Sequence, residues 1–229
     1  MAAYRAVLKA DPGNCEALTD LANQYILLGT AYTRERSQKS RLFQKAMQYC
    51  ELAMYTNPAF RREADLGKKP WEAADSLLAE DAPAMFFWVT ALQFEFKEVM
   101  TLPSKMINVG WMQYGIIFLD RIKKVAPDFG HGAVEFAYTI CYCALPSRQG
   151  GDDLKCRQYM SDAVNQSSGY LLARWGRGKY FHQLKGDITS SRQDLQWVVE
   201  QDIAAAKDVY PWRVYFKEDA ASQLSLLGD

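Results

Sequence analysis

The sequence is short of histidine, of net charge and of long apolar runs, and each shortage bears on function. Only two of its 229 residues are histidines, His131 and His182, and neither has a second ligand at metal-site spacing, so no metal is expected. The 27 basic and 27 acidic side chains cancel, which argues against a nucleic-acid partner. No run of about 18 apolar residues occurs, so no segment is expected to span a membrane.

The five cysteines include no Cys-x-x-Cys motif. Cys141 and Cys143 would lie on different sides of a helix, which argues against a redox pair or a zinc ribbon. Most of the five fall in apolar helical patterns, so all five are expected to be free, slowly reactive thiols. A thiol enzyme that pairs a cysteine with a histidine is one reading of the chain, but no family-type motif surrounds any cysteine.

What the sequence does contain is a repeated helical pattern, clearest over Gly150–Gly169. An acidic pair after two glycines can cap the start of a helix, and the final glycine can end it. Between these ends Cys156, Met160 and Ala163 share one face, and two of the three are small enough for another helix to approach closely. This small, medium, small stripe is typical of the second helix of a tetratricopeptide hairpin.

The same spacing occurs earlier as Ala46, Cys50 and Ala53, and Pro58 closes that unit. No segment alternates with period two for long enough to form a sheet. We therefore expect an all-α fold, an irregular tetratricopeptide-like superhelix of about 10–12 helices, in a single domain over residues 1–229.

Other local signals refine this expectation. Asp81, followed by Ala-Pro, marks a helix start, and Pro103 opens a helix predicted to run to Val125. The glycines around Arg177 resemble a phosphate loop only superficially, since no strand precedes them. Gly178 is instead expected at a close helix contact. No catalytic residue and no cofactor are expected.

Aromatic side chains are abundant, with 13 Tyr, 11 Phe and 6 Trp, and many crowd the middle helices. They can simply form the core. The alternative is a groove or tunnel that takes an apolar or amphipathic small molecule. In that case Trp88, Trp111 and Tyr114 are the best candidates to line a cavity that opens to solvent.

The chain resembles the T components (TatT) of tripartite ATP-independent periplasmic (TRAP) transporters that carry tetratricopeptide repeats. The resemblance rests on the order of PAMFFWVTAL, then LPSRQGGDDLKCRQYMSDAVNQSSGYLLARWGRGKYF, then LQWVVEQD and a last leucine-paired helix. It covers nearly the whole chain, and the GGD helix with SSGYLL is its most specific part. The resemblance implies an all-α, non-enzymatic lipoprotein that works beside a periplasmic substrate-binding protein.

The expected function is thus that of a periplasmic accessory protein, lipid-anchored through a signal absent from this chain, which docks a substrate-binding protein. It would pass an apolar or amphipathic ligand through an aromatic-lined channel. The alternative is a cytoplasmic adaptor that grips a peptide in the concave groove of its repeats. A second copy of the chain is left open as a partner.

Overall fold

In a computed structural model the described residues, 1–228, form α-helices joined by turns and no β-strand. Twelve α-helices lie in this part of the chain, which confirms the predicted all-α class. Five further helical segments are the 3₁₀ turns η1 (Ala74–Ser76), η2 (Ala79–Asp81) and η4 (Ser147–Gln149) and the π-helices η3 (Glu95–Val99) and η5 (Arg177–His182). The α-helices are α1 (Ala2–Ala10), α2 (Cys15–Tyr32), α3 (Arg36–Tyr55), α4 (Pro58–Asp65), α5 (Ala82–Phe94), α6 (Leu102–Asn108), α7 (Trp111–Val125), α8 (Ala133–Ala144), α9 (Asp153–Gln166), α10 (Leu172–Gly176), α11 (Ile188–Glu200) and α12 (Tyr210–Leu226).

The chain divides into two compact units, and the boundary between them falls inside α8. Unit 1 comprises Met1–Phe129 and Ile140–Asp152. Unit 2 comprises Gly130–Thr139 and the described chain from Asp153 onward. The single domain expected from the sequence stays a prediction, as does its tetratricopeptide-like superhelix.

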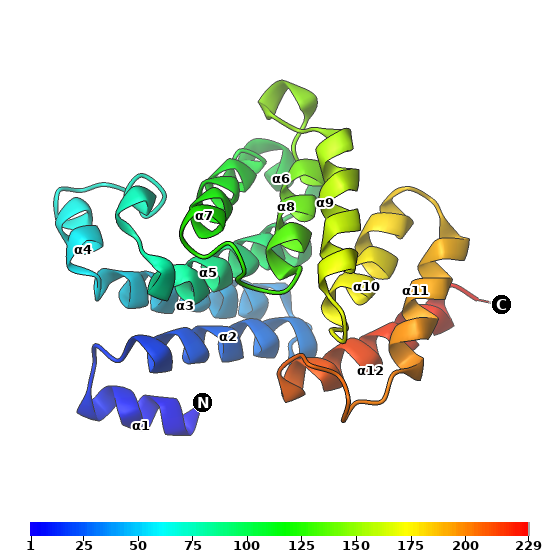
Figure 1. Cartoon of the computed structure of the whole chain (residues 1–229), viewed down its shortest axis with the longest axis horizontal. Helices are drawn as coiled ribbons and strands as arrows, with labels where there is room; N and C mark the ends of the chain where they lie inside the picture. Colours follow the sequence, from blue (N-terminus) through cyan, green and yellow to red (C-terminus); the bar gives the residue numbers. More distant parts are fainter. Residues whose placement is uncertain (229) are drawn as a thin grey trace. The chain divides into compact units, whose positions relative to one another are not determined.

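In unit 1 each long helix packs on the next one along the chain, with α1 on α2, α2 on α3 and α3 on α5 (Figure 1). The predicted stripe of α3 faces inward, because Ala46, Cys50 and Ala53 have no exposed surface. A Cβ atom at Gly29 of α2 would lie 2.5 Å from Cε1 of the fully buried Phe43, so glycine permits this close approach. Small residues thus set the distance between α2 and α3.

Unit 2 uses small residues in the same way. The stripe of α9 is buried, and a Cβ atom at Gly132 would lie only 2.3 Å from the carbonyl oxygen of Ala163. Gly178 forms the close contact predicted for it, since a Cβ atom there would lie 2.9 Å from Cγ of Leu195 in α11. Both stripes therefore lie at helix contacts, as the sequence predicts.

The helix expected from Pro103 to Val125 is wrong as a single element. It is divided into α6 and α7, and Gly110 is the N-cap of α7. Glycine costs a helix interior about 1 kcal/mol relative to alanine. The apolar periodicity continues on both sides of Gly110, so it gives no sign of this break.

The expectation of five free thiols is also wrong. Cys143 and Cys156 are disulfide-bonded, whereas Cys15, Cys50 and Cys141 are free. Periodicity assigns a cysteine to one face of a helix, and Cys156 is indeed fully buried. Periodicity carries no information on which sulfur atoms lie within bonding distance, so a buried position does not distinguish a free thiol from a disulfide-bonded one.

Candidate functional site

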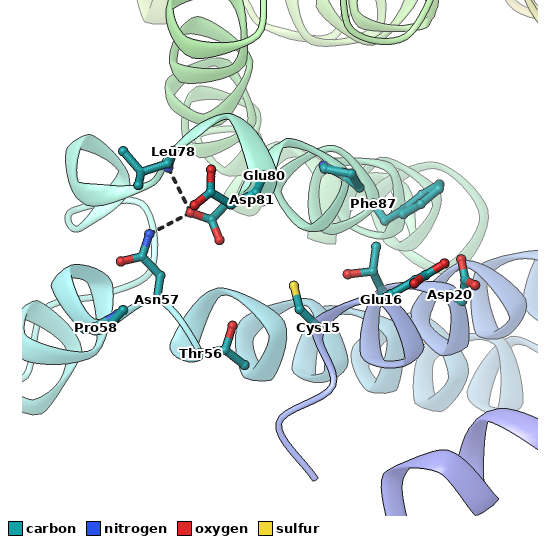
Figure 2. A pocket seen from close by; sticks show the side chains of 12 residues that line it. Cys15, Glu16, Asp20, Thr56, Asn57, Pro58, Leu78, Glu80, Asp81 and Phe87 are labelled. Carbon is teal, nitrogen blue, oxygen red and sulfur yellow. Dashed lines mark hydrogen bonds between the residues drawn. The ribbon is translucent and has the colours of Figure 1, made fainter. Parts of the chain in front are cut away.

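Unit 1 contains a pocket of about 540 Å³ at the start of α2, the turn between α3 and α4, and the start of α5 (Figure 2). Small-molecule sites have volumes of roughly 300–1,000 Å³, so this pocket has the size of a ligand site. We call it the acidic pocket. It is lined by Cys15, Glu16, Thr19, Asp20, Thr56, Asn57, Pro58, Leu78, Glu80, Asp81, Pro83 and Phe87.

The first wall of the acidic pocket is the start of α2. Asn14 caps this helix, since its side chain accepts a 2.9 Å hydrogen bond from a backbone N–H of the first turn. Side chains four residues apart lie on the same face of a helix. Cys15 therefore lies beside Thr19, and Glu16 beside Asp20, along the pocket wall.

Asn57 and Asp81 connect the other walls. Asn57 caps α4, where its Oδ1 accepts a 2.9 Å hydrogen bond from the N–H of Ala59. Its Nδ2 donates to Asp81 Oδ2 at 2.7 Å, and the backbone N–H of Leu78 donates to the same oxygen at 2.8 Å. The other carboxylate oxygen, Asp81 Oδ1, accepts no hydrogen bond from the described residues.

Asp81 is also the most deeply buried acid of the pocket, with 2% of its surface exposed. Burial raises the pKa of its carboxyl group, while the hydrogen bonds from Leu78 and Asn57 oppose that shift. The charge of Arg121 lowers this pKa as well, although its Nε donates to the carbonyl oxygen of Leu77 at 2.8 Å. The carboxylate of Asp81 is therefore only partly compensated.

The charge in the acidic pocket is of one sign. Four of its twelve lining residues are Asp or Glu, and no lysine or arginine is among them. Carboxylates gathered on the walls of a hollow produce a negative potential that attracts cations. Pro58, Leu78, Pro83 and Phe87 supply apolar surface between these charges.

Cys15 is the one thiol in the acidic pocket. It is free and half-buried, and burial raises its pKa, with the nearby Asp81 and Glu80 acting in the same direction. A nucleophilic cysteine needs a lowered pKa so that the thiolate forms near neutral pH. The surroundings of Cys15 thus favour a protonated thiol.

None of the three aromatic residues proposed from the sequence lines the acidic pocket. Trp88 is 3% exposed, and its Nε1 donates to Glu51 Oε1 at 2.8 Å. Tyr114 stacks on Trp71 with ring centroids 4.0 Å apart, and Trp71 in turn lies 6.1 Å from Trp88. Trp111 is half-buried at the start of α7. A ligand contact by these residues stays a prediction.

Sequence reasoning missed the acidic pocket for an identifiable reason. Asp81 and the carboxylates of α2 each have a sufficient local explanation, as a helix start or a solvated face. Asn57 before Pro58 is likewise an ordinary helix cap. The pocket exists because these segments meet in three dimensions, and no periodicity reports that meeting.

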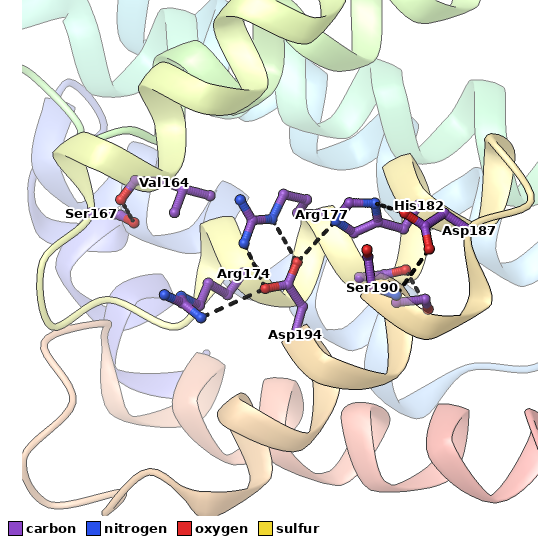
Figure 3. A network of polar contacts seen from close by, with 10 residues as sticks. Val164, Ser167, Arg174, Arg177, His182, Asp187, Ser190 and Asp194 are labelled. Carbon is purple, nitrogen blue, oxygen red and sulfur yellow. Dashed lines mark hydrogen bonds and ion pairs between the residues drawn. The ribbon is translucent and has the colours of Figure 1, made fainter. Parts of the chain in front are cut away.

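A polar network in unit 2 contains His182 (Figure 3). At its centre is Asp194, which accepts hydrogen bonds from Nε and Nη2 of Arg177 at 2.6 and 2.7 Å. Its carboxylate also lies 3.4 Å from Nε2 of His182 and 3.7 Å from Nη1 of Arg174. Three cationic or polar partners already surround this carboxylate, so the network joins η5 to α11 and leaves Asp194 no capacity for a ligand.

The remaining histidine, His131, stacks on Tyr170 with ring centroids 5.1 Å apart. Among residues 1–228 no three of the His, Cys, Asp and Glu side chains are grouped so that they could hold one metal ion. Within the same residues, no helix has both the length and the apolar character needed to cross a membrane. A scan against protein-family models finds no match to this chain, and a search of curated proteins finds none either.

Proposed function

We propose that the chain is a non-enzymatic accessory protein of a solute transport system of the TRAP type, which docks a periplasmic substrate-binding protein. Its resemblance to the TatT components suggests this role, and the helix packing supports it. The small-residue stripes of α3 and α9 are buried at helix contacts, as in stacked hairpins that display surfaces for partners. Trp88, Trp111 and Tyr114 are the proposed contacts for an apolar ligand.

The observation that carries the docking role is the exposed apolar surface of α6. Leu102, Met106 and Ile107 are 72%, 72% and 82% exposed, although the helix has only 7 residues. Apolar side chains gathered on one element mark interaction sites, whereas singly scattered ones do not. Burial of each by a partner would contribute roughly 1.5–3 kcal/mol. We assign this face to the substrate-binding protein.

A periplasmic location is supported by the disulfide-bonded Cys143 and Cys156. Structural disulfides persist in oxidising compartments such as the bacterial periplasm and are rare in the reducing cytosol. The alternative role, a cytoplasmic adaptor that binds a peptide, would leave both thiols reduced. The cysteines therefore favour the periplasmic accessory protein, held at the membrane by a lipid anchor outside this chain.

The docking role can be tested with the purified chain and a purified periplasmic substrate-binding protein of a TRAP transporter from the same organism. Isothermal titration should give saturable binding, and the double variant Met106→Glu, Ile107→Glu should lose at least tenfold in affinity, about 1.4 kcal/mol. Leu66→Glu is the matched control, because Leu66 is 79% exposed at the end of α4. No binding by the wild-type chain would refute the docking role, and equal loss in the control would refute its assignment to α6.

A further inference from the structure

We infer that the acidic pocket binds a linear aliphatic diamine or polyamine, with the amino groups at the carboxylates and the methylene groups on the apolar side chains. Such binding is independent of docking at α6, so either proposal can fail alone. The inference rests on the charge, the hydrogen-bonding state, the spacing and the apolar surface of the residues that line the pocket.

The charge of the lining residues selects a cation. Glu16, Asp20, Glu80 and Asp81 face the same hollow, and none of the other eight lining residues carries a positive charge. Arg121 is the cation that acts on Asp81, but its guanidinium group is held by the carbonyl oxygen of Leu77. These carboxylates would repel an anionic ligand, and a neutral ligand would gain nothing from their charge.

The hydrogen bonding of Asp81 points to a donor that comes from a ligand. Asp81 is buried and lines the pocket, yet both hydrogen bonds from the protein fall on Oδ2. Figure 2 shows the carboxylate beside Asn57 and Glu80, facing the wall that carries Cys15 and Thr56. Because Oδ1 accepts no hydrogen bond from the described residues, an ammonium N–H there would add a charge-assisted hydrogen bond without displacing a protein contact.

The spacing of the carboxylates selects an extended cation over a metal ion. Glu16 and Asp20 belong to α2, whereas Glu80 and Asp81 belong to η2, and Figure 2 shows the two pairs on different sides of Cys15. No three acidic, cysteine or histidine side chains of residues 1–228 converge on one point as a metal site requires. A chain with an amino group at each end can reach both pairs.

The surface between the two pairs is suited to methylene groups. Leu78, Pro83 and Phe87 line the pocket without hydrogen-bonding side chains, so water held there gains little and an aliphatic chain can displace it. An aromatic face beside an ammonium group adds a cation–π attraction. The volume of about 540 Å³ accommodates a short aliphatic chain.

The test is isothermal titration of the whole chain with 1,5-diaminopentane and with spermidine. We expect both to bind at least tenfold more tightly than 1-aminopentane, which has a single charge, and to weaken as salt is raised. Pentane-1,5-diol and glutarate should give no binding. Equal binding of the diol or glutarate, binding of Mg²⁺ or Ca²⁺ that displaces the diamine, or no diamine binding at about 1 mM would overturn the inference.

Diamine affinities of variants test whether the acidic pocket is the binding site. Glu80→Gln and Glu16→Gln change exposed side chains, so both should fold normally and each weaken diamine binding by up to about fivefold. Asp81→Asn should weaken it by tenfold or more, with folding checked by circular dichroism. Glu218→Gln is the matched control, an exposed glutamate of α12 in unit 2, and should bind as the wild type does. Unchanged affinity in Glu80→Gln and Glu16→Gln together would contradict this site.

Discussion

Asn57 Nδ2 donates a 2.7 Å hydrogen bond to Asp81 Oδ2 across 24 residues of sequence. Asn57 is the N-cap of α4, and Asp81 immediately precedes α5. One amide side chain therefore connects two helix starts that form two walls of the acidic pocket. The shape of the pocket depends on that connection, and so does the placement of the buried carboxylate.

Replacement of Asn57 with Ala should test how strongly the two helix starts are connected. The variant loses a helix cap, which costs about 0.5–2 kcal/mol, and leaves Asp81 with one donor fewer, which costs about 1–3 kcal/mol. Urea unfolding should show the larger loss in Asn57→Ala than in Asn14→Ala, because Asn14 only caps α2 and bonds to an exposed loop residue. Equal losses in the two variants would show that the bond to Asp81 contributes nothing.

The small-residue stripes give a packing prediction. Ala53 and Ala163 have no exposed surface, so Ala53→Leu and Ala163→Leu should each lower the free energy of unfolding by about 1–3 kcal/mol through overpacking. Ala3→Leu, at an exposed position of α1, is the control and should change it by less than about 0.5 kcal/mol. Wild-type stability in both variants would contradict the inferred orientation of α3 and α9, in which these alanines face another helix.

The cysteines give a count that mass spectrometry can check. Iodoacetamide added in denaturant without reductant should label three thiols, Cys15, Cys50 and Cys141, and all five cysteines after reduction. In the folded protein Cys50 and Cys141 should react more slowly than Cys15, because both are fully buried and burial raises the pKa of both thiols, that of Cys141 to about 12. Five labels in unreduced protein purified from the periplasm would contradict the disulfide and the proposed compartment.

His182 predicts a dependence of stability on pH. Burial lowers its pKa below the ordinary 6.5, against the opposing charge of Asp194. The unfolded chain therefore binds the proton first as the pH falls, so the stability contributed by neutral His182 is present above 6.5 and is lost as the pH falls from there through the lower pKa of the folded state. From about pH 7.5 to 5.5, wild-type stability should fall more than that of His182→Asn.

The control for this pH prediction is His131→Asn, which keeps His182 and tolerates the left-handed backbone at position 131, where φ is 46°. Urea midpoints at both pH values provide the measurement. If His182→Asn and the wild type lose the same stability from about pH 7.5 to about pH 5.5, the pKa of His182 is not lowered in the folded protein.

The helices were largely predictable because their signals are local. The inward face of Ala46, Cys50 and Ala53 follows from periodicity, and the structure confirms it. A helix does begin after Asp81 as predicted, although the Asp81 side chain makes no cap hydrogen bond to α5 and accepts one from the N–H of Leu78 instead. The break at Gly110 did not follow, since the apolar pattern runs through it. Local preferences of a few tenths to 1 kcal/mol per residue cannot decide such a break when tertiary packing opposes them.

The candidate site was much less predictable than the helices. The acidic pocket depends on the convergence of Glu16, Asn57 and Asp81, which belong to three separate segments. The disulfide state of Cys143 and Cys156 depends on distance in the same way. Each residue has an adequate local role as a cap, a solvated charge or a small buried side chain, so only the folded chain reveals what they form together.

The most direct test of the central claim, that α6 docks a substrate-binding protein, is hydrogen–deuterium exchange of the chain with and without that partner. Docking should slow exchange in Leu102–Asn108 and in the adjoining start of α7, because burial of the exposed side chains of α6 removes these amides from water. Exchange in α4, which carries the control residue Leu66 at its end, should not change. Slowed exchange in α4 with none in α6, or no change anywhere at saturating partner, would contradict the claim.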